Sequence, residues 1–432
     1  MIKRPILLEK LINRKQNGRV KVITGLRRAG KSFLLTDIYI PYLKAQGIEN
    51  ECIITLSLDE LKYSKYRNPL ELDTYIRSKI KDSEKQYYIF LDEIQKVETI
   101  QNPYIQDKES KITFVDVILG LLKIKNADIY ITGSNSKMLS SDILTEFRGR
   151  GDEIQVHPLS YAEFYSGYEG DKRNAWRDYF VYGGMPGLIE CKSHEQKSLY
   201  LKDLFENTYI TDILERNNIR YEKNILDTLL NIISSSTGSL TNPSVIANTF
   251  KSVEKINIKY ETITDYISYF ENAFLVRKAE RYDIKGRKYI GRQRKYYFED
   301  VGLRNARLGF RQNEENHIME NVIYNELIVR GFDVDVGVVE YNYKDPDGKS
   351  KRVQLEVDFI ATNGNMVYYI QSALAIGDEA KRIQETNSLN RITNSFKKIV
   401  IIKDNIIPWH DDKGILYLGI EDFLLIPDAI DK

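Results

Sequence analysis

Short apolar runs alternate with segments of helical periodicity through the first third of the chain. The runs that predict buried strands are Val20–Thr24, Cys52–Leu58, Tyr87–Leu91, Ile129–Thr132 and Glu153–Val156. Apolar residues recur at helical spacing between them, over Lys31–Leu43, Leu70–Lys81 and Thr113–Lys125. Strands that alternate with helices are typical of a doubly wound parallel sheet. We therefore expect an α/β fold for this part of the chain.

The pattern becomes helical from about Tyr161. Apolar residues at helical spacing predict helices over Ala175–Tyr182, Ser198–Arg216, Glu222–Ser235 and Asn242–Ala279. Thr262 is the predicted N-cap of a helix over Ile263–Leu275.

The last part of the chain returns to a mixed pattern. The elements expected there are a hairpin over Arg281–Ile290, a strand over Lys295–Phe298, a helix over His317–Arg330, strands at Val334–Val338, Gln354–Ile360, Val367–Gln371 and Lys398–Ile402, and a helix over Ala380–Ser395. These changes of pattern place domain boundaries near residues 165 and 310, so we predict domains over 1–165, 166–310 and 311–432.

Residues 25–32 read Gly-Leu-Arg-Arg-Ala-Gly-Lys-Ser, which fits the G-x-x-x-x-G-K-S pattern of phosphate-binding loops. A strand precedes the loop and a helix follows it, as this motif requires. The two glycines permit a tight turn with inward N–H groups, and the helix directs its positive end at the phosphates. We expect Lys31 to contact the β- and γ-phosphates of ATP and Ser32 to bind Mg²⁺. The predicted nucleotide contacts are Gly25, Arg27, Arg28, Ala29, Gly30, Lys31, Ser32 and Phe33.

Two carboxylates follow the apolar run of residues 87–91. Ligands of doubly wound sheets lie beyond the carboxyl ends of the strands, so Asp92 and Glu93 are expected beside the phosphates. Asp92 is the predicted Mg²⁺ ligand and Glu93 the predicted general base toward water. Acidic residues that end a strand are also common in solvated turns, and the phosphate loop is what favours the functional interpretation here.

Two later segments supply further candidates for catalysis. The strand over 127–132 is followed by Gly-Ser-Asn-Ser, where Asn135, or else Ser134, would hold the attacking water. The segment Phe-Arg-Gly-Arg-Gly of residues 147–151 offers Arg150, or else Arg148, to the γ-phosphate of a neighbouring subunit. A polar turn and a solvated basic loop are the simpler alternatives. If Arg150 acts in trans, the active form is a homo-oligomer.

The ordered motifs GLRRAGKS, YIFLDEIQ, ITGSNS, FRGR and PLSYAEF resemble the AAA-superfamily ATPases of bacteria and archaea, in particular the group with a C-terminal domain of unknown function. The resemblance continues through YGGMPG, TYITDILERN, KYYFEDVGLRNA, MENVIYNEL and EVDFI, and so spans nearly the whole chain. It implies an AAA-type P-loop sheet core, a helical region with a winged-helix-like part, and a small restriction-endonuclease-like α/β domain.

A winged helix either binds duplex DNA or serves as a structural part of an ATPase. The basic side chains that would contact DNA are Lys251, Lys255, Lys259, Arg281, Lys285, Arg287, Lys288, Arg292 and Arg294. The whole chain has 63 basic and 62 acidic residues and a formal net charge of +1, so no overall basic field supports DNA binding. Both alternatives stay open.

The resemblance to restriction endonucleases implies a Mg²⁺ site made of a helix Glu, a strand Asp, and a Glu or Gln two residues before a Lys. The matching positions are Glu320 or Glu326, then Asp358, then Gln371. Ala373 stands where the Lys is required, and no nearby residue is expected to replace that cation. Loss of such an electrostatic group costs about 10²–10³ in rate. We therefore predict a degenerate site without nuclease activity.

Other features of the composition narrow the possibilities. Cys52 and Cys191 fit neither a zinc spacing nor a disulfide framework, and the four histidines show no metal spacing. No apolar run is long enough to span a membrane. We expect a cytoplasmic, ATP-hydrolysing switch with Mg²⁺ as cofactor. Its partner would be duplex DNA or, in a signalling or scaffolding role, another protein; an active nuclease is the least favoured alternative.

Overall fold

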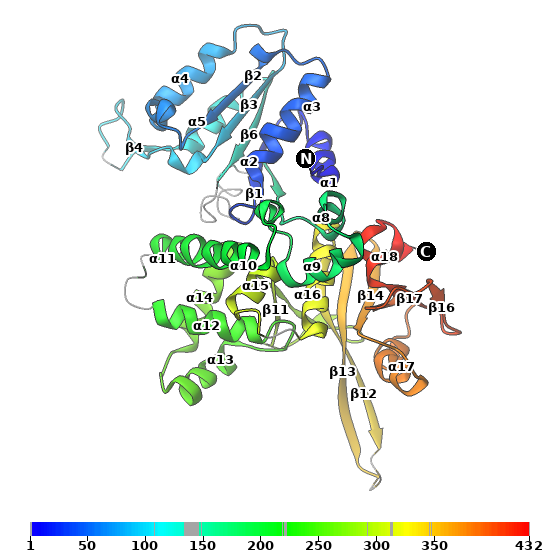
Figure 1. Cartoon of the computed structure of the whole chain (residues 1–432). Helices are drawn as coiled ribbons and strands as arrows, with labels where there is room; N and C mark the ends of the chain where they lie inside the picture. Colours follow the sequence, from blue (N-terminus) through cyan, green and yellow to red (C-terminus); the bar gives the residue numbers. More distant parts are fainter. Residues whose placement is uncertain are drawn as a thin grey trace. The chain divides into compact units, whose positions relative to one another are not determined.

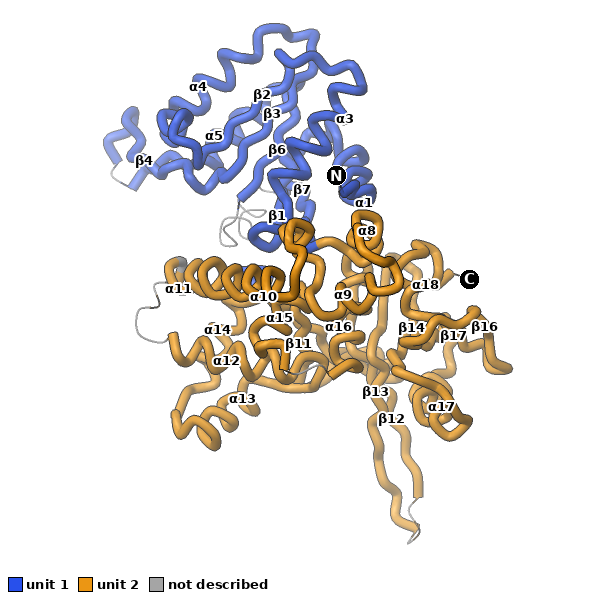
Figure 2. The backbone as a smooth tube through the Cα atoms, in the orientation of Figure 1, with its two compact units in different colours: residues 1–158, 272–274 blue, residues 159–271, 275–432 orange. Residues whose placement is uncertain are grey.

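The computed structural model describes residues 2–107, 109–133, 147, 149–217, 219, 223–291, 293–311, 314–344, 346 and 348–431. The chain divides into two compact units, which Figure 2 colours separately. The first unit is Met1–Pro158 with Asn272–Phe274, and the second is Leu159–Glu271 with Leu275–Lys432. The predicted boundary near residue 310 falls inside the second unit, and the division into three domains stays a prediction.

A five-stranded parallel sheet forms the centre of the first unit (Figure 1). The strand order is β2-β3-β6-β1-β7, and every neighbouring pair is parallel. The strands are β1 (Val20–Thr24), β2 (Ile53–Ser57), β3 (Tyr87–Asp92), β6 (Ala127–Thr132) and β7 (Gly151–Gln155). The predicted α/β core with a parallel sheet is confirmed.

Helices cover both faces of this sheet, because alternate residues of each strand point to opposite sides. Ile89 and Leu91 pack in one core cluster with side chains of α4 (Pro69–Lys79) and α5 (Phe114–Leu121). The ring of Phe90 faces the other side, where its centroid lies 6.1 Å from that of Tyr39. The remaining elements of this unit are α1 (Pro5–Asn13), α2 (Lys31–Phe33), the π-helical turn η1 (Leu34–Tyr39), α3 (Ile40–Ala45), the short helices η2 (Asn50–Cys52), η3 (Leu61–Arg67) and η4 (Ile94–Lys96), and the hairpin β4 (Ile100–Gln101) with β5 (Lys111–Ile112).

The first half of the second unit is mainly helical. Its helices are α8 (Tyr161–Gly167), α9 (Ala175–Tyr182), α10 (His194–Asp203), η7 (Leu204–Ile210), α11 (Thr211–Arg216), α12 (Lys223–Ser235), α13 (Pro243–Thr249), η8 (Phe250–Glu254), α14 (Tyr260–Asn272) and α15 (Val301–Arg307), with short turns η5 (Lys172–Asn174) and η6 (Pro186–Glu190). Two predictions here are wrong. Thr262 lies inside α14 rather than at its N-cap. Residues 276–279 form a strand rather than the end of a helix, because they pair antiparallel with Lys295–Phe298.

This strand, β8 (Val276–Ala279), pairs antiparallel with β11 (Lys295–Phe298) as a two-stranded ribbon. The predicted hairpin is present between them as β9 (Arg281–Asp283) and β10 (Lys288–Tyr289). Both strands of that hairpin join the edge of a larger sheet formed by the C-terminal residues.

An eight-stranded mixed sheet forms the second half of this unit, in the order β10-β9-β12-β13-β14-β15-β17-β16. Its C-terminal strands are β12 (Asp333–Lys344), β13 (Ser350–Asn363), β14 (Met366–Ala373), β15 (Lys397–Ile402), β16 (Trp409–His410) and β17 (Ile415–Gly419). One face packs against α16 (Glu315–Val329) and α18 (Ile420–Leu425), and the other face packs against Leu389 and Ile392. The helix predicted over Ala380–Ser395 is shorter, since α17 (Glu379–Thr386) gives way to the 3₁₀ turn η9 (Leu389–Arg391). A last turn, η10, spans Ala429–Asp431.

Candidate functional site

The loop between β1 and α2 has the backbone that its glycines permit. Gly25 has a φ of +127°, and a Cβ added there would lie 2.1 Å from the Val156 carbonyl oxygen. Gly30 precedes the helix with a φ of +95°. Both positions therefore require glycine, for backbone conformation and, at Gly25, for space as well. This is how the sequence produces the tight turn expected of a phosphate-binding loop.

The side chain of Lys31 folds back over this loop. Its Nζ donates to the carbonyl oxygens of Gly25, at 3.0 Å, and Leu26, at 3.1 Å, and the residue is buried. These contacts fix an ammonium group inside the turn of the loop. Ser32 and Phe33 are exposed at the start of the helix, where the first N–H groups have no acceptor within the helix. The loop therefore combines a fixed cation with amide donors, which is the chemistry that a phosphate chain requires.

Asp92 and Glu93 lie at the carboxyl end of β3, as predicted. The Oγ1 of Thr132, the last residue of β6, hydrogen-bonds to the Asp92 carboxylate, and it accepts from the Glu93 backbone N–H at 3.3 Å. The side-chain amide of Gln95 donates to the Glu93 carboxylate. Glu93 has a φ of +53°, in the left-handed region that few non-glycine residues adopt. The two acids are thus held in defined orientations rather than in a freely solvated turn.

The strand register brings these groups to one edge of the sheet. Ile131 pairs with both Leu91 and Val22, and Thr132 pairs with Ile23. Strand β6 therefore lies between the strand that leads into the loop and the strand that ends in the acids. At a spacing of about 4.8 Å between neighbouring strands, the ends of β1 and β3 lie roughly 10 Å apart. Phosphates bound at the loop would extend toward Asp92 and Glu93.

Arg4 braces the loop from the N-terminal segment. Its guanidinium donates to the carbonyl oxygen of Ala29 at 3.1 Å and to those of His157 and Pro158 at 2.8 and 3.2 Å. The side chain is buried. Arg4 ties one end of the phosphate loop to the segment after β7. Arg4 could not be predicted from the sequence, because no local motif marks an arginine so far from the loop along the chain.

Some of the other predicted contact residues lie within the described residues, and some do not. Arg27 and Arg28 are exposed, and Ala29 is buried. Arg150 is exposed in front of β7, and its carbonyl oxygen accepts from the Val20 N–H at 2.9 Å. Asn135, Ser134 and Arg148 lie outside the described residues.

Only some of the residues predicted for the nuclease-like site lie close together. Gln371 donates from Nε2 to the Asp358 Oδ2 at 2.8 Å, and Asp358 and Glu320 both lie close to the ammonium of Lys295. Glu326 is not among them, since its carboxylate pairs with Arg330 at 2.7 Å. The expectation that no cation replaces the missing lysine is wrong. Lys295 from β11 places its Nζ 2.8 Å from Glu320 Oε1, a contact between residues too distant in sequence for a motif to reveal.

The motif segments of the second unit also contact one another. Asp300 caps α15 by accepting from the Leu303 N–H at 3.0 Å, and it accepts from the Gly184 N–H at 2.7 Å. Burial raises the pKa of Asp300 to about 6 even though these N–H groups favour its ionised form. A Cβ on Gly183 would lie 2.3 Å from this carboxylate. The segments YGGMPG (residues 182–187) and FEDVGL (residues 298–303) thus pack tightly against each other.

The basic side chains predicted to contact DNA are distributed unevenly. Lys251, Lys255 and Lys259 are exposed just before α14, and Lys285, Arg287 and Lys288 are exposed on the β9–β10 hairpin. Arg294 instead pairs with Glu280 at 3.3 Å, and Arg281 bonds to Gln354 at 3.1 Å. Arg292 lies outside the described residues.

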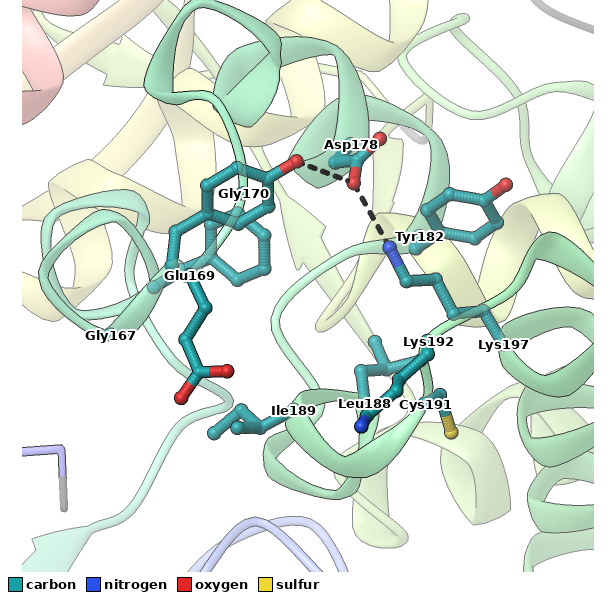
Figure 3. Close-up of a pocket in the computed structure, with 12 residues that line it drawn as sticks. Gly167, Glu169, Gly170, Asp178, Tyr182, Leu188, Ile189, Cys191, Lys192 and Lys197 are labelled. Carbon is teal, nitrogen blue, oxygen red and sulfur yellow. Dashed lines mark hydrogen bonds and ion pairs between the residues drawn. The ribbon is translucent and has the colours of Figure 1, made fainter.

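A cavity of about 310 Å³ lies among α8, α9 and α10 of the second unit (Figure 3). Its main polar group is Asp178, which accepts from Lys197 at 2.9 Å and from the Tyr168 hydroxyl at 2.8 Å. The charge of this carboxylate is therefore already matched by Lys197. The cavity contains none of the residues predicted to bind nucleotide.

Two further findings concern the described part of the chain. Cys52 and Cys191 are both free thiols. No helix within the described ranges is both long and apolar enough to cross a membrane.

Comparisons with known proteins agree with the geometry of the first unit. Residues 17–165 match the AAA domain family, and residues 173–314 match a domain of unknown function. An uncharacterised protein of Haemophilus influenzae is 33% identical over 407 residues, which cover 93% of each chain. An uncharacterised protein of Methanocaldococcus jannaschii is 28% identical over 424 residues, 94% of this chain and 85% of that protein.

Among solved structures, a Walker-type ATPase of Pyrococcus abyssi is 14% identical with a TM-score of 0.46, over 71% of this chain and 96% of its own. On its similarity to the Haemophilus influenzae protein over 93% of both sequences, this chain belongs to the family that includes that uncharacterised relative, and its residues 17–165 belong to the AAA domain family.

Proposed function

We propose that this chain binds ATP with Mg²⁺ and hydrolyses it in the first unit. One observation carries the proposal. The loop of residues 25–32 and the acids Asp92 and Glu93 stand at the same edge of the sheet, and Thr132 from the intervening strand fixes the acids. A phosphate-binding loop beside two oriented carboxylates is the arrangement that phosphoryl transfer to water needs.

The residues of the site divide the work. Lys31 and the amides of the loop hold the phosphates, with Gly25, Arg27, Arg28, Ala29, Gly30 and Phe33 as the remaining nucleotide contacts. The hydroxyl of Ser32 and the carboxylate of Asp92 suit Mg²⁺, which prefers oxygen ligands. When bound, Mg²⁺ neutralises charge that develops on the phosphate oxygens. Glu93 accepts the proton of the attacking water, and we assign its orientation to Gln95 and Thr132.

Two further roles extend this proposal beyond the described contacts. Asn135 is assigned to hold the attacking water beside the γ-phosphate. Arg150 is assigned to the γ-phosphate of a neighbouring subunit, which its exposed position in front of β7 supports. Under this assignment the active protein is a homo-oligomer, because no chain completes its own site.

We propose that hydrolysis in the first unit drives a conformational switch read by a partner of the second unit. Helices α12, α13 and α14, followed by the β8–β11 ribbon, have the order of elements of a winged helix. In that arrangement α14 would be the second helix of the helix-turn-helix, which is the one that contacts DNA. Its sequence contains Glu261, Asp265 and Glu271 but neither Lys nor Arg. Such a helix would repel DNA phosphates. The charge of α14 therefore favours a protein partner.

Duplex DNA is the second candidate partner. It is favoured by the exposed lysines before α14 and by the exposed basic side chains of the β9–β10 hairpin. Binding through these groups would weaken steeply with salt, because each phosphate contact releases counterions. We assign the C-terminal sheet to a restriction-endonuclease-like scaffold without nuclease activity, because the buried Lys295 ammonium is paired with Glu320 and Glu356 and so is withheld from a substrate phosphate.

The test is steady-state ATP turnover by the full chain with Mg²⁺, with and without duplex DNA. Lys31→Ala is expected to lower turnover by about 10²–10³ because a preorganised charge at the phosphates is lost. Lys44→Ala, an exposed lysine on the same helical segment, is the control and should keep the activity of the unaltered protein. Activity retained in Lys31→Ala would refute the assignment of this site. ATP turnover that is stimulated by duplex DNA at low salt would favour DNA, rather than a protein, as the partner.

A further inference from the structure

A buried lysine lies among three carboxylates in the second unit. Lys295 is 3% exposed. Its Nζ is 2.7 Å from Glu356 Oε1, 2.8 Å from Glu320 Oε1 and 3.8 Å from Asp358 Oδ1. The ammonium therefore occupies the place where the three acids converge. These four residues are called the Lys295 cluster below.

The members of the Lys295 cluster come from separate elements. Lys295 is on the β11 ribbon, Glu320 is on α16, and the other two acids are on β13. The remaining oxygen of Asp358 accepts from Gln371 Nε2 and from the Ser372 N–H, each at 2.8 Å. The packing of β11, α16 and β13 thus brings these four side chains together, so the cluster differs from an ion pair between two mobile surface side chains.

Neighbouring groups close the cluster around Glu320. The Tyr297 hydroxyl, on the same face of β11 as Lys295, donates to Glu320 Oε1 at 2.6 Å. On the other side, a Cβ added to Gly238 would lie 3.3 Å from Glu320 Oε2. The Oε1 of Glu320 thus accepts from both Lys295 and Tyr297, so this oxygen is already engaged by two donors.

The charges of the cluster are mutually dependent. Burial alone would lower the pKa of Lys295, but the charges of Glu320, Asp358 and Glu356 raise it above its ordinary value. The lysine therefore stays protonated. Burial, together with the charge of Glu320, raises the pKa of Asp358 above its ordinary value. Breaking a buried pair of this kind on one side is strongly destabilising, because a charge is left without compensation.

We propose that the Lys295 ammonium is a built-in cation that takes the position of a metal ion in the C-terminal sheet. A divalent ion would need its oxygen ligands at about 2.0–2.6 Å, and Lys295 already contacts two of these three acids at hydrogen-bond distance. The ammonium instead fastens the β11 ribbon to α16 and β13, and the sheet needs no metal.

The proposal is tested by Mn²⁺ binding to the full chain without nucleotide, followed by electron paramagnetic resonance. Lys295→Met removes the ammonium and should bind one additional Mn²⁺ per chain compared with the unaltered protein. Adding Asp358→Asn to that variant should remove the extra ion. Lys197→Met is the matched control, since Lys197 pairs with the single carboxylate Asp178 and its loss should create no site.

Either of two results would overturn the proposal. One is a folded Lys295→Met variant that gains no Mn²⁺. The other is an unaltered protein that binds Mn²⁺ in this region and loses it with Asp358→Asn alone. If Lys295→Met does not fold, Lys295→Gln keeps a neutral hydrogen-bond donor and is expected to gain the same ion. The second overturning result needs no change at Lys295 and so applies in every case.

Discussion

The hydroxyl of Thr132 contacts both acids at the carboxyl end of β3, Asp92 and Glu93. It bonds to the Asp92 carboxylate and accepts from the Glu93 N–H, so one side chain orients both predicted catalytic groups. Thr132→Val keeps the shape of the side chain and removes both bonds. Because groups that orient ligands contribute about 10–100-fold to activity, we expect ATP turnover to fall by that amount. Thr132→Ser should restore most of it. Equal turnover in Thr132→Val and the unaltered protein would remove Thr132 from the site.

Asp300 predicts a pH dependence of stability in the second unit. Its pKa is raised from 3.8 to about 6, so between these values the folded chain holds a proton that the unfolded chain has lost. Stability from this group is therefore fully present below about pH 4 and falls by about 3 kcal/mol as pH rises to 6. Urea denaturation across this range should show the fall in the unaltered protein but not in Asp300→Asn. A fall of equal size in both proteins would contradict the prediction.

The residues found from sequence were those in a contiguous motif. The loop 25–32 and the pair Asp92–Glu93 were predicted from spacing, because strand, turn and helix follow each other directly. Arg4 and Lys295 were not, since each meets its partners across long stretches of chain. Only the fold reveals such contacts. Glu320 and Glu326 lie on the same helix, α16, and spacing alone could not separate them. Their partners, Lys295 and Arg330, distinguish them.

Elements with strong local signals had accurate bounds, and elements set by tertiary pairing did not. Strand β1 and helix α9 match their predicted ranges. The helix after the loop runs on from Lys31 to Ala45 but passes through a π-helical turn over Leu34–Tyr39. Pro41 lacks an N–H and so cannot bond to the residue four before it, which favours the wider turn there. No periodicity of apolar residues signals such a change.

The contact between α15 and α9 gives a prediction at this scale. A Cβ on Gly302 would lie 1.7 Å from the Tyr182 carbonyl oxygen, so the two helices approach too closely for any other residue. Gly302→Ala should destabilise the second unit by about 3 kcal/mol, as overpacking does. Gly377→Ala is the control, because its added Cβ meets no atom within 4 Å. Thermal unfolding compares them, and equal midpoints would mean that the joint is not tightly packed.

At the scale of the whole molecule, the sequence predicted an α/β part followed by a helical part, and the compact units divide near that point. The local pattern of residues does not reveal how the chain is organised around the boundary predicted near residue 310. The β9–β10 hairpin pairs with β12, which joins residues before 310 to the C-terminal sheet. Such pairing depends on strands far apart in sequence, and a local pattern contains no information on it.

The assignment of Arg150 makes a prediction about assembly. If Arg150 reaches the γ-phosphate of a neighbouring subunit, turnover per chain should rise with protein concentration, and Arg150→Ala should lower turnover by about 10³ or more. Mixing Arg150→Ala with Glu93→Gln should recover activity, because one variant supplies an intact site and the other supplies the arginine. Specific activity that is flat with concentration, together with no recovery on mixing, would place Arg150 outside catalysis.

The central claim is that Glu93 activates water for ATP hydrolysis at the edge of the sheet. The most direct measurement compares ATP binding and ATP turnover in Glu93→Gln, with the exposed Glu98→Gln as control. We predict that Glu93→Gln binds ATP as the unaltered protein does and loses about 10²–10⁴ in turnover, the usual contribution of a general base, while the control loses neither. Turnover retained in Glu93→Gln would contradict the account.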